Sequence, residues 1–136
     1  MRVPFIKFSD IYTHNKEEIL GALDRVLSAG EICLGDYGKD IKELEKWFAE
    51  FIGVKHAIMC GSGTQALYLS YKALGIGPGD EVITVAHTFS ATFDQIVALG
   101  ATPILVDIGE DGLMDPIEVE KAITLKTKAI APVHLE

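Results

Sequence analysis

Beyond residue 53 the sequence alternates between short apolar segments and single segments with helical periodicity. The apolar segments read HAIMC (56–60), EVITVA (81–86), TPILVDI (102–108) and KAIAPVH (128–134), and the helical periodicity lies over 64–74, 90–99 and 116–123. Strands that are apolar on both faces and are separated by single helices form parallel sheets with right-handed crossovers. The pattern therefore predicts an α/β fold whose sheet is mainly parallel and has helices on both faces.

The residues before this alternation read as two helices. Over 14–29 the apolar side chains recur at helical spacing, with Asn15 as the expected N-cap and Gly30 as the stop. The segment 38–53 is also amphipathic, and its apolar face is expected to be core: Ile41, Leu44, Trp47, Phe48 and Phe51.

These patterns divide the chain into a helical segment over 1–53 and an α/β segment over 54–134. The last apolar segment ends without a turn or a cap, and Leu135–Glu136 is a pair that common expression vectors append. We therefore expect residues 135–136 to be a cloning scar and the chain to be the N-terminal piece of a longer protein.

Composition and charge exclude several classes of function. The chain has 136 residues, 49% of them hydrophobic, and a formal net charge of -8, so nucleic acids and acidic membranes would meet like charge. No apolar run is long enough to span a membrane, and the start lacks the core of a signal peptide, which predicts a cytoplasmic protein. Cys33 and Cys60 have no metal-ligand spacing, so we expect reduced thiols, Cys60 buried, and no metal site.

A glycine-rich loop, CGSGT (60–64), stands between the first predicted strand and the helix that follows it. Free backbone N–H groups and the helix dipole favour an anion at such a point. The loop has no Gly-Lys pair and no third glycine, which argues against a P-loop or a dinucleotide fingerprint. Two interpretations remain open: a cradle for one phosphate, or a turn shaped by Gly61 and Gly63 with Thr64 capping the helix.

The next two strands also end in polar loops, AHTFS (86–90) and DIGEDG (107–112). Binding sites in parallel sheets lie at the carboxyl ends of the strands, so these loops are expected beside the glycine loop. Phe89 could stack on a flat ring whose phosphate lies in that loop. His87 could act as a general base, or it could make an ordinary hydrogen bond.

These motifs together carry a family resemblance. The run over 61–108, followed by DP (115–116) and KTKAIAPVH (126–134), resembles the N-terminal part of the DegT/StrS family of sugar aminotransferases. The resemblance implies the large domain of the aspartate aminotransferase-like fold (fold type I) and the cofactor pyridoxal 5'-phosphate (PLP). It also implies transfer of an amino group, commonly from glutamate, to a nucleotide-linked keto-sugar for polysaccharide or antibiotic biosynthesis.

Residue by residue, the resemblance implies that Gly63, Thr64 and Gln65 bind the cofactor phosphate, through backbone N–H groups and the Thr64 hydroxyl. Phe89 takes the position that stacks on the pyridine ring, and Gly35 matches a glycine on the substrate side. Glutamine at position 65 replaces the small residue more usual in the family, which is harmless if only its N–H is used.

The resemblance places the catalytic residues outside this chain. The aspartate that pairs with the pyridine nitrogen and the lysine that forms the Schiff base are expected downstream of Glu136, so the chain alone should bind PLP weakly and not transaminate. It implies a homodimer for the intact enzyme. A PLP-dependent sugar dehydratase, a natural short non-catalytic binding or assembly module, and an unrelated phosphate-binding α/β domain stay open, as does the identity of the keto-sugar and nucleotide.

Overall fold

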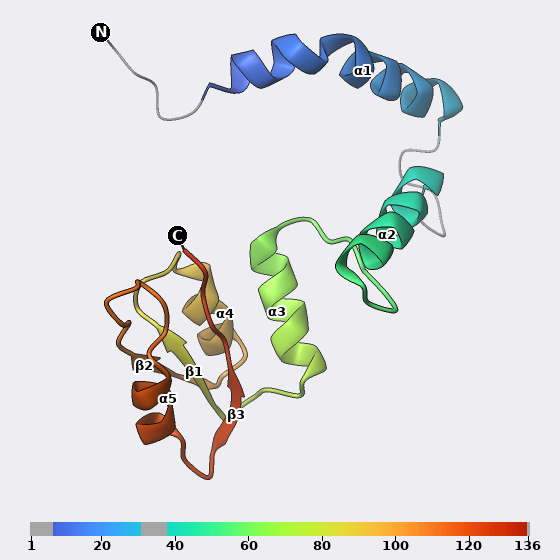
Figure 1. Cartoon of the computed structure of the whole chain (residues 1–136). Coiled ribbons are helices and arrows are strands. Elements are labelled where there is room, and N and C mark those ends of the chain that lie inside the picture. Colours follow the sequence, from blue (N-terminus) through green and yellow to red (C-terminus); the bar gives the residue numbers. More distant parts are fainter. Residues whose placement is uncertain (1–6, 31–37, 136) are drawn as a thin grey trace, which may run out of the picture. The chain divides into compact units, whose positions relative to one another are not determined.

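A computed structural model describes residues 7–30 and 38–135 of the chain, which divides into compact units over 1–59 and 60–136 (Figure 1). Cys33 and Gly35 lie outside the described residues. The first unit holds α1 (Phe8–Ala29) and α2 (Lys39–Ile52); the second holds α3 (Gly63–Ala73), β1 (Glu81–Val85), α4 (Ala91–Ala98), β2 (Thr102–Val106), α5 (Pro116–Ala122) and β3 (Thr127–Ile130). Among the residues described, no helix is long and apolar enough to cross a membrane.

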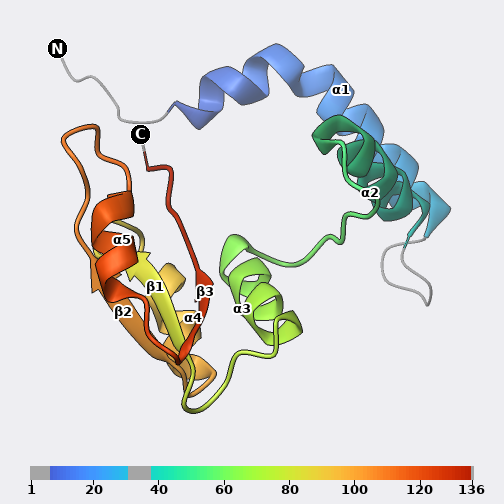
Figure 2. The ribbon, with the colours of Figure 1, turned by 60° about the horizontal axis from the view of Figure 1, so that its bottom comes forward.

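The second unit is built on a parallel sheet, as predicted. Its strand order is β2-β1-β3, and β1 pairs in parallel with both neighbours, for example Ile83 with Ile104 and with Ile130. The connection from β1 to β2 and the connection from β2 to β3 run in opposite directions across the sheet. Right-handed crossovers then require their helices on opposite faces, and Figure 2 shows α4 and α5 on opposite sides of the sheet.

The core of this unit lies between β1 and the helices α3 and α4. Val82 and Ile96 are fully buried, and Tyr71, Ile76 and Ala101 are buried around them. The opposite face of β1 is equally dry, since Ile83 has no exposed surface. A central strand that is buried on both faces explains why its sequence is an unbroken apolar run rather than an alternating one.

Local sequence signals account for several helix ends. Asp115 is the N-cap of α5, where its carboxylate accepts the Ile117 N–H at 2.8 Å, and Pro116 follows at the first helical position. Gly30 and Gly53 end α1 and α2 with left-handed backbone, φ 68° and 77°.

The prediction for the start of the first helix is wrong. Helix α1 begins at Phe8 rather than near His14, so Asn15 lies inside the helix and is not its N-cap. The Asn15 amide instead donates to the Ile11 carbonyl at 2.9 Å. A polar side chain that binds the preceding turn satisfies itself locally, and the helix continues through it.

The segment 56–60, predicted as a strand, is not one here. It has strand-like composition, but it pairs with no strand among the described residues, and the Met59 N–H donates to the Glu45 side chain at 2.8 Å. A strand exists only where a neighbouring strand supplies the ladder of hydrogen bonds, and composition cannot supply that neighbour.

The apolar face of α2 was expected to be core, and this is also wrong for the described residues. Trp47 is 57% exposed and Phe51 is 70% exposed, and their rings stack on each other at 5.4 Å between centroids. Cys60, expected to be buried, is exposed. Amphipathic spacing identifies the apolar side of a helix but not the surface that covers it.

We predict that Ile96→Ala lowers the free energy of unfolding by about 2–5 kcal/mol, because it opens a cavity in the fully buried contact between α4 and the sheet. The measurement is the urea midpoint of the chain. Val97→Ala on the same helix is the control, since Val97 is 58% exposed, and it should change stability by at most about 0.5 kcal/mol. Equal losses from the two variants would contradict the assigned core.

Candidate functional site

The amino end of α3 and the carboxyl end of β1 lie at the same end of the second unit. Both views of the ribbon show α3 running opposite to β1, so the glycine loop before α3 and the loop after β1 both lie at that end (Figures 1 and 2). The helix α4 also begins there, because it follows β1 directly. This is the edge at which parallel sheets bind ligands.

Two hydrogen bonds link the glycine loop to the first turn of helix α3. Ser62 is the N-cap of α3, and its hydroxyl accepts the Gln65 N–H at 3.2 Å. The side-chain carbonyl of Gln65 accepts the Gly61 N–H at 2.8 Å. The expectation that Thr64 caps the helix is therefore wrong. The spacing Ser-x-x-Gln over 62–65 is that of a capping box and would have identified Ser62 from the sequence.

Three backbone donors at this helix end stay free. Within the described part of the chain, the N–H groups of Ser62, Gly63 and Thr64 have no acceptor, whereas the Gln65 N–H already binds the Ser62 hydroxyl. The amino end of α4 is partly satisfied, because its Thr92 and Phe93 N–H groups donate to carbonyls of the preceding turn, whereas the Ala91 N–H has no acceptor among the described residues. Both helix ends at the carboxyl edge thus keep donors for an anion, and α3 is the one that follows the glycine loop.

The two glycines of the loop are not required by the backbone. Neither Gly61 nor Gly63 has the left-handed φ at which glycine is favoured, so the interpretation as a turn that only glycine can make loses its basis. A Cβ at Gly63 would point into open space, with no atom within 4 Å. Free N–H groups, a neighbouring threonine hydroxyl and open space are a donor set that fits a phosphate monoester.

Phe89 lies in the loop after β1 and is 73% exposed, which leaves its ring free to stack. The loop that carries Phe89 is hydrogen-bonded to α4, and α4 is in turn hydrogen-bonded to α3. The Thr88 hydroxyl bonds the Thr92 hydroxyl at 2.9 Å, and the Tyr71 hydroxyl donates to the Thr92 carbonyl at 3.2 Å. Sequence reasoning missed Tyr71 and Thr92. The i, i+4 threonine spacing over 88–92 was the available signal for one of these bonds.

The remaining polar residues of this edge have structural roles or no partner. His87 is exposed and makes no hydrogen bond to any described residue, so neither interpretation of it gains support. In the third loop, Asp111 accepts the Leu113 N–H at 3.1 Å, and Asp115 caps α5. The hollow beside that loop is lined by Glu110, Asp111 and Asp115, so it is acidic and unsuited to a phosphate.

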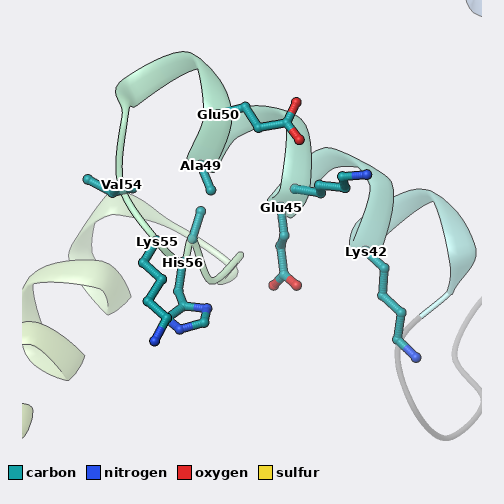
Figure 3. A pocket seen from close by; sticks show the side chains of 9 residues that line it. Lys42, Glu45, Ala49, Glu50, Val54, Lys55 and His56 are labelled. Atoms are coloured by element: carbon teal, nitrogen blue, oxygen red, sulfur yellow. The ribbon is translucent and has the colours of Figure 1, made fainter.

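A separate pocket of about 380 Å³ lies in the first unit, along α2 and the segment after it (Figure 3). The side chains of Glu45, Lys55 and His56 point to the same side, while Glu50 points away. Basic and acidic groups are mixed here, and Glu45 is already bound to the Met59 N–H. None of the four residues predicted to bind the cofactor lines this pocket, and Gly35 lies outside the described residues.

The fold and the site together define a class of protein: an α/β domain with an open helix end at the carboxyl edge of its parallel sheet. The sequence family is more specific. Residues 13–136 match the DegT/DnrJ/EryC1/StrS aminotransferase family, and the chain belongs to that family. The predicted resemblance is thereby confirmed, and an unrelated phosphate-binding domain is excluded.

Curated relatives match along nearly the whole chain. It is 46% identical to a pleiotropic regulatory protein of Geobacillus stearothermophilus, over 99% of this chain and 36% of the relative. It is 42% identical to UDP-2-acetamido-2-deoxy-3-oxo-D-glucuronate aminotransferase of Pseudomonas aeruginosa, over 98% of this chain and 36% of the relative.

Solved structures agree with this assignment. DesV of Streptomyces venezuelae, in complex with a ketimine intermediate, superimposes with a TM-score of 0.92 at 43% identity, over 98% of this chain and 36% of DesV. NtdA of Bacillus subtilis with bound PMP gives 0.89 at 39% identity, over 98% of this chain and 31% of NtdA. The fold is thus part of a fold type I large domain, and the cofactor of the family is PLP. The chain spans about a third of the length of these relatives, from 31% to 36%.

Burial raises the pKa of the Tyr71 hydroxyl above its ordinary value of 10.0, which predicts an alkaline loss of stability. The folded chain keeps this proton where the unfolded chain releases it, so the contribution is complete below pH 10.0 and declines as the pH rises above it. Tyr71→Phe should flatten this decline and, by losing the bond to Thr92, cost about 1 kcal/mol at neutral pH. Urea midpoints from about pH 8 to about pH 11 test this; parallel profiles would contradict it.

Proposed function

We propose that this chain forms the cofactor-phosphate part of a PLP-dependent aminotransferase that transfers an amino group to a nucleotide-linked keto-sugar. The observation that carries the proposal is the open amino end of α3, where the backbone N–H groups of Gly63 and Thr64 are free. The backbone conformation at Gly61 and Gly63 does not itself require glycine. Family membership supplies the ligand for these donors, because relatives are solved with PLP and PMP.

In this proposal the residues of the chain bind and orient the cofactor. The Gly63 and Thr64 N–H groups and the Thr64 hydroxyl hold its phosphate, and the exposed ring of Phe89 stacks on its pyridine ring. When bound, PLP supplies the electron sink that amino-group transfer needs. The groups that move protons during the reaction are expected outside residues 1–136, which agrees with the lack of a carboxylate partner for His87 among the described residues.

The amino donor, the oligomeric state and the cellular location are proposed from the family. Glutamate as amino donor, a homodimer and a cytoplasmic location rest on the family resemblance. A homodimer would cover apolar side chains that the described residues leave exposed, such as Trp47 and Phe51. The relatives whose names contain a nucleotide sugar support that class of substrate, but they differ among themselves in nucleotide and sugar.

The complete reading frame that contains these 136 residues is expected to bind PLP covalently and to aminate a nucleotide-linked keto-sugar with glutamate. Absorption of the protein-bound cofactor, borohydride trapping of a lysine and mass analysis of the sugar product test the binding and the reaction separately. The chain alone should bind PLP weakly and trap no lysine.

Each result separates the alternatives. Loss of oxygen from the sugar without gain of nitrogen would identify a dehydratase. A complete product that binds no PLP would favour a non-catalytic module and overturn the proposal. Tight PLP binding with a trapped lysine in the 136-residue chain would contradict the expectation for the chain alone.

Gly63→Ala should change stability and binding in opposite directions. Alanine fits the helical backbone at this position and reduces the entropy of the unfolded chain, so stability should rise by about 0.4–1 kcal/mol. The added methyl group occupies the open space beside the free donors, so PLP affinity should fall about tenfold, or roughly 1.4 kcal/mol.

The matched control is Gly21→Ala, inside α1, where an added Cβ also meets no atom within 4 Å. It should leave PLP affinity unchanged. Thermal unfolding and PLP titration of the complete protein measure both effects, and unaltered PLP affinity in Gly63→Ala would count against a phosphate at this helix end.

A further inference from the structure

The side chain of Gln65 is part of the glycine loop and not merely a neighbour of it. The side-chain carbonyl of Gln65 accepts the Gly61 N–H at 2.8 Å, while the backbone N–H of Gln65 donates to the Ser62 hydroxyl at 3.2 Å. A standard capping box would return the side chain to the N–H of the cap residue itself, but here it reaches one residue further back. The two bonds enclose Gly63 and Thr64, whose N–H groups are among the free donors.

The orientation of the Gln65 amide follows from its partner. A backbone N–H can only donate, so the atom that faces Gly61 must be the carbonyl oxygen of the side chain. The amide nitrogen therefore occupies the other branch, and its two N–H groups have no acceptor among the described residues. Position 65 thus places a neutral donor group at the edge of the loop.

Gly61 and Gln65 depend on each other sterically. A Cβ at Gly61 would lie 3.0 Å from the Gln65 side-chain oxygen, which is closer than such contacts normally allow. The backbone of Gly61 does not need glycine for its φ angle. A Cβ at position 61 would therefore require the Gln65 amide to shift away from the Gly61 N–H.

We propose that Gln65 is a positioning residue of the phosphate-binding loop, whose side chain holds Gly61 in place while remaining uncharged beside the phosphate. This inference rests on the proposed function. A loop that is ordered before its ligand arrives loses less entropy on binding, so the bond to Gly61 raises affinity without touching the ligand. The family resemblance implies a role only for the backbone N–H of Gln65, and in the structure that N–H donates to the Ser62 hydroxyl.

Helix stability does not explain why position 65 has a neutral glutamine rather than a glutamate. A glutamate at position 65 could accept the same Gly61 N–H, and a carboxylate in the first turn is favoured by the helix dipole. A carboxylate would, however, place negative charge beside the phosphate. If Gln65 served the helix alone, glutamate would be an equal or better residue there.

The test uses the complete protein with three variants and two ligands. The variants are Gln65→Ala, Gln65→Glu and Gly61→Ala, and the probes are pyridoxamine 5'-phosphate and pyridoxamine, which lacks the phosphate. Dissociation constants from fluorescence titration and midpoints of thermal unfolding are measured for each. Gln95→Glu is the control for an added charge, because Gln95 lies on α4 away from its amino end.

Gln65→Ala should weaken pyridoxamine 5'-phosphate binding about five- to tenfold, since it removes the hydrogen bond to Gly61. Gly61→Ala keeps the backbone N–H and should weaken binding by a smaller factor, because its Cβ displaces the Gln65 oxygen that accepts this bond. Their double variant should be no weaker than Gln65→Ala. Gln65→Glu should keep or raise the unfolding midpoint yet weaken the phosphorylated ligand about tenfold or more. That loss should shrink at high salt and be absent with pyridoxamine. Gln95→Glu should bind as the unaltered protein does.

Two results overturn the inference in different ways. If the unaltered protein binds pyridoxamine 5'-phosphate and Gln65→Ala and Gln65→Glu bind it equally well, Gln65 serves only the helix and the proposed function stands. If the unaltered protein does not distinguish the phosphorylated from the phosphate-free ligand, the proposed phosphate site itself fails. Should Gln65→Ala fold poorly, Gln65→Glu decides the inference alone, because its predicted loss is of phosphate affinity and not of stability.

Discussion

The complete burial of strand β1 is the constraint on which the second unit depends. Val82 and Ile83 have no exposed surface, and because their side chains point to opposite faces, both faces of the strand must be covered. A central parallel strand can be covered only by crossover helices, and the reversal of direction after β2 places them on opposite sides. The same reversal separates the loops that follow β1 and β2, and a ligand can enter where such loops diverge.

Helix α3 takes part in this arrangement through its contact with α4. Tyr71 joins the core and donates its hydroxyl to the Thr92 carbonyl at 3.2 Å, while Thr88 bonds the Thr92 side chain. These bonds hold the loop that carries Phe89 in a fixed relation to the helix whose amino end is open. The proposed cofactor site is therefore set by buried contacts one to two turns away from it, and its own residues remain exposed.

The site itself is made mainly of backbone groups, and this explains why its chemistry was hard to assign from residue types. The donors belong to Gly63 and Thr64, and the glycines matter for space rather than for backbone conformation. The Ser62 hydroxyl and the Gln65 side chain satisfy the N–H groups of Gln65 and Gly61, and an anion could accept the N–H groups that remain free. A loop of this kind recognises a phosphate through geometry, which several different side-chain sets could produce.

Local interactions are what the sequence by itself determined. The parallel α/β alternation, the Asp115–Pro116 helix start and the glycine stops follow from neighbours within a few residues, and the ordered motifs identified the family. Only the tertiary structure decided that residues 56–60 form no strand and that the apolar face of α2 stays exposed. Strand pairing and burial need a partner distant in the chain. That partner is not encoded in the identity of a single residue or in its spacing from the next.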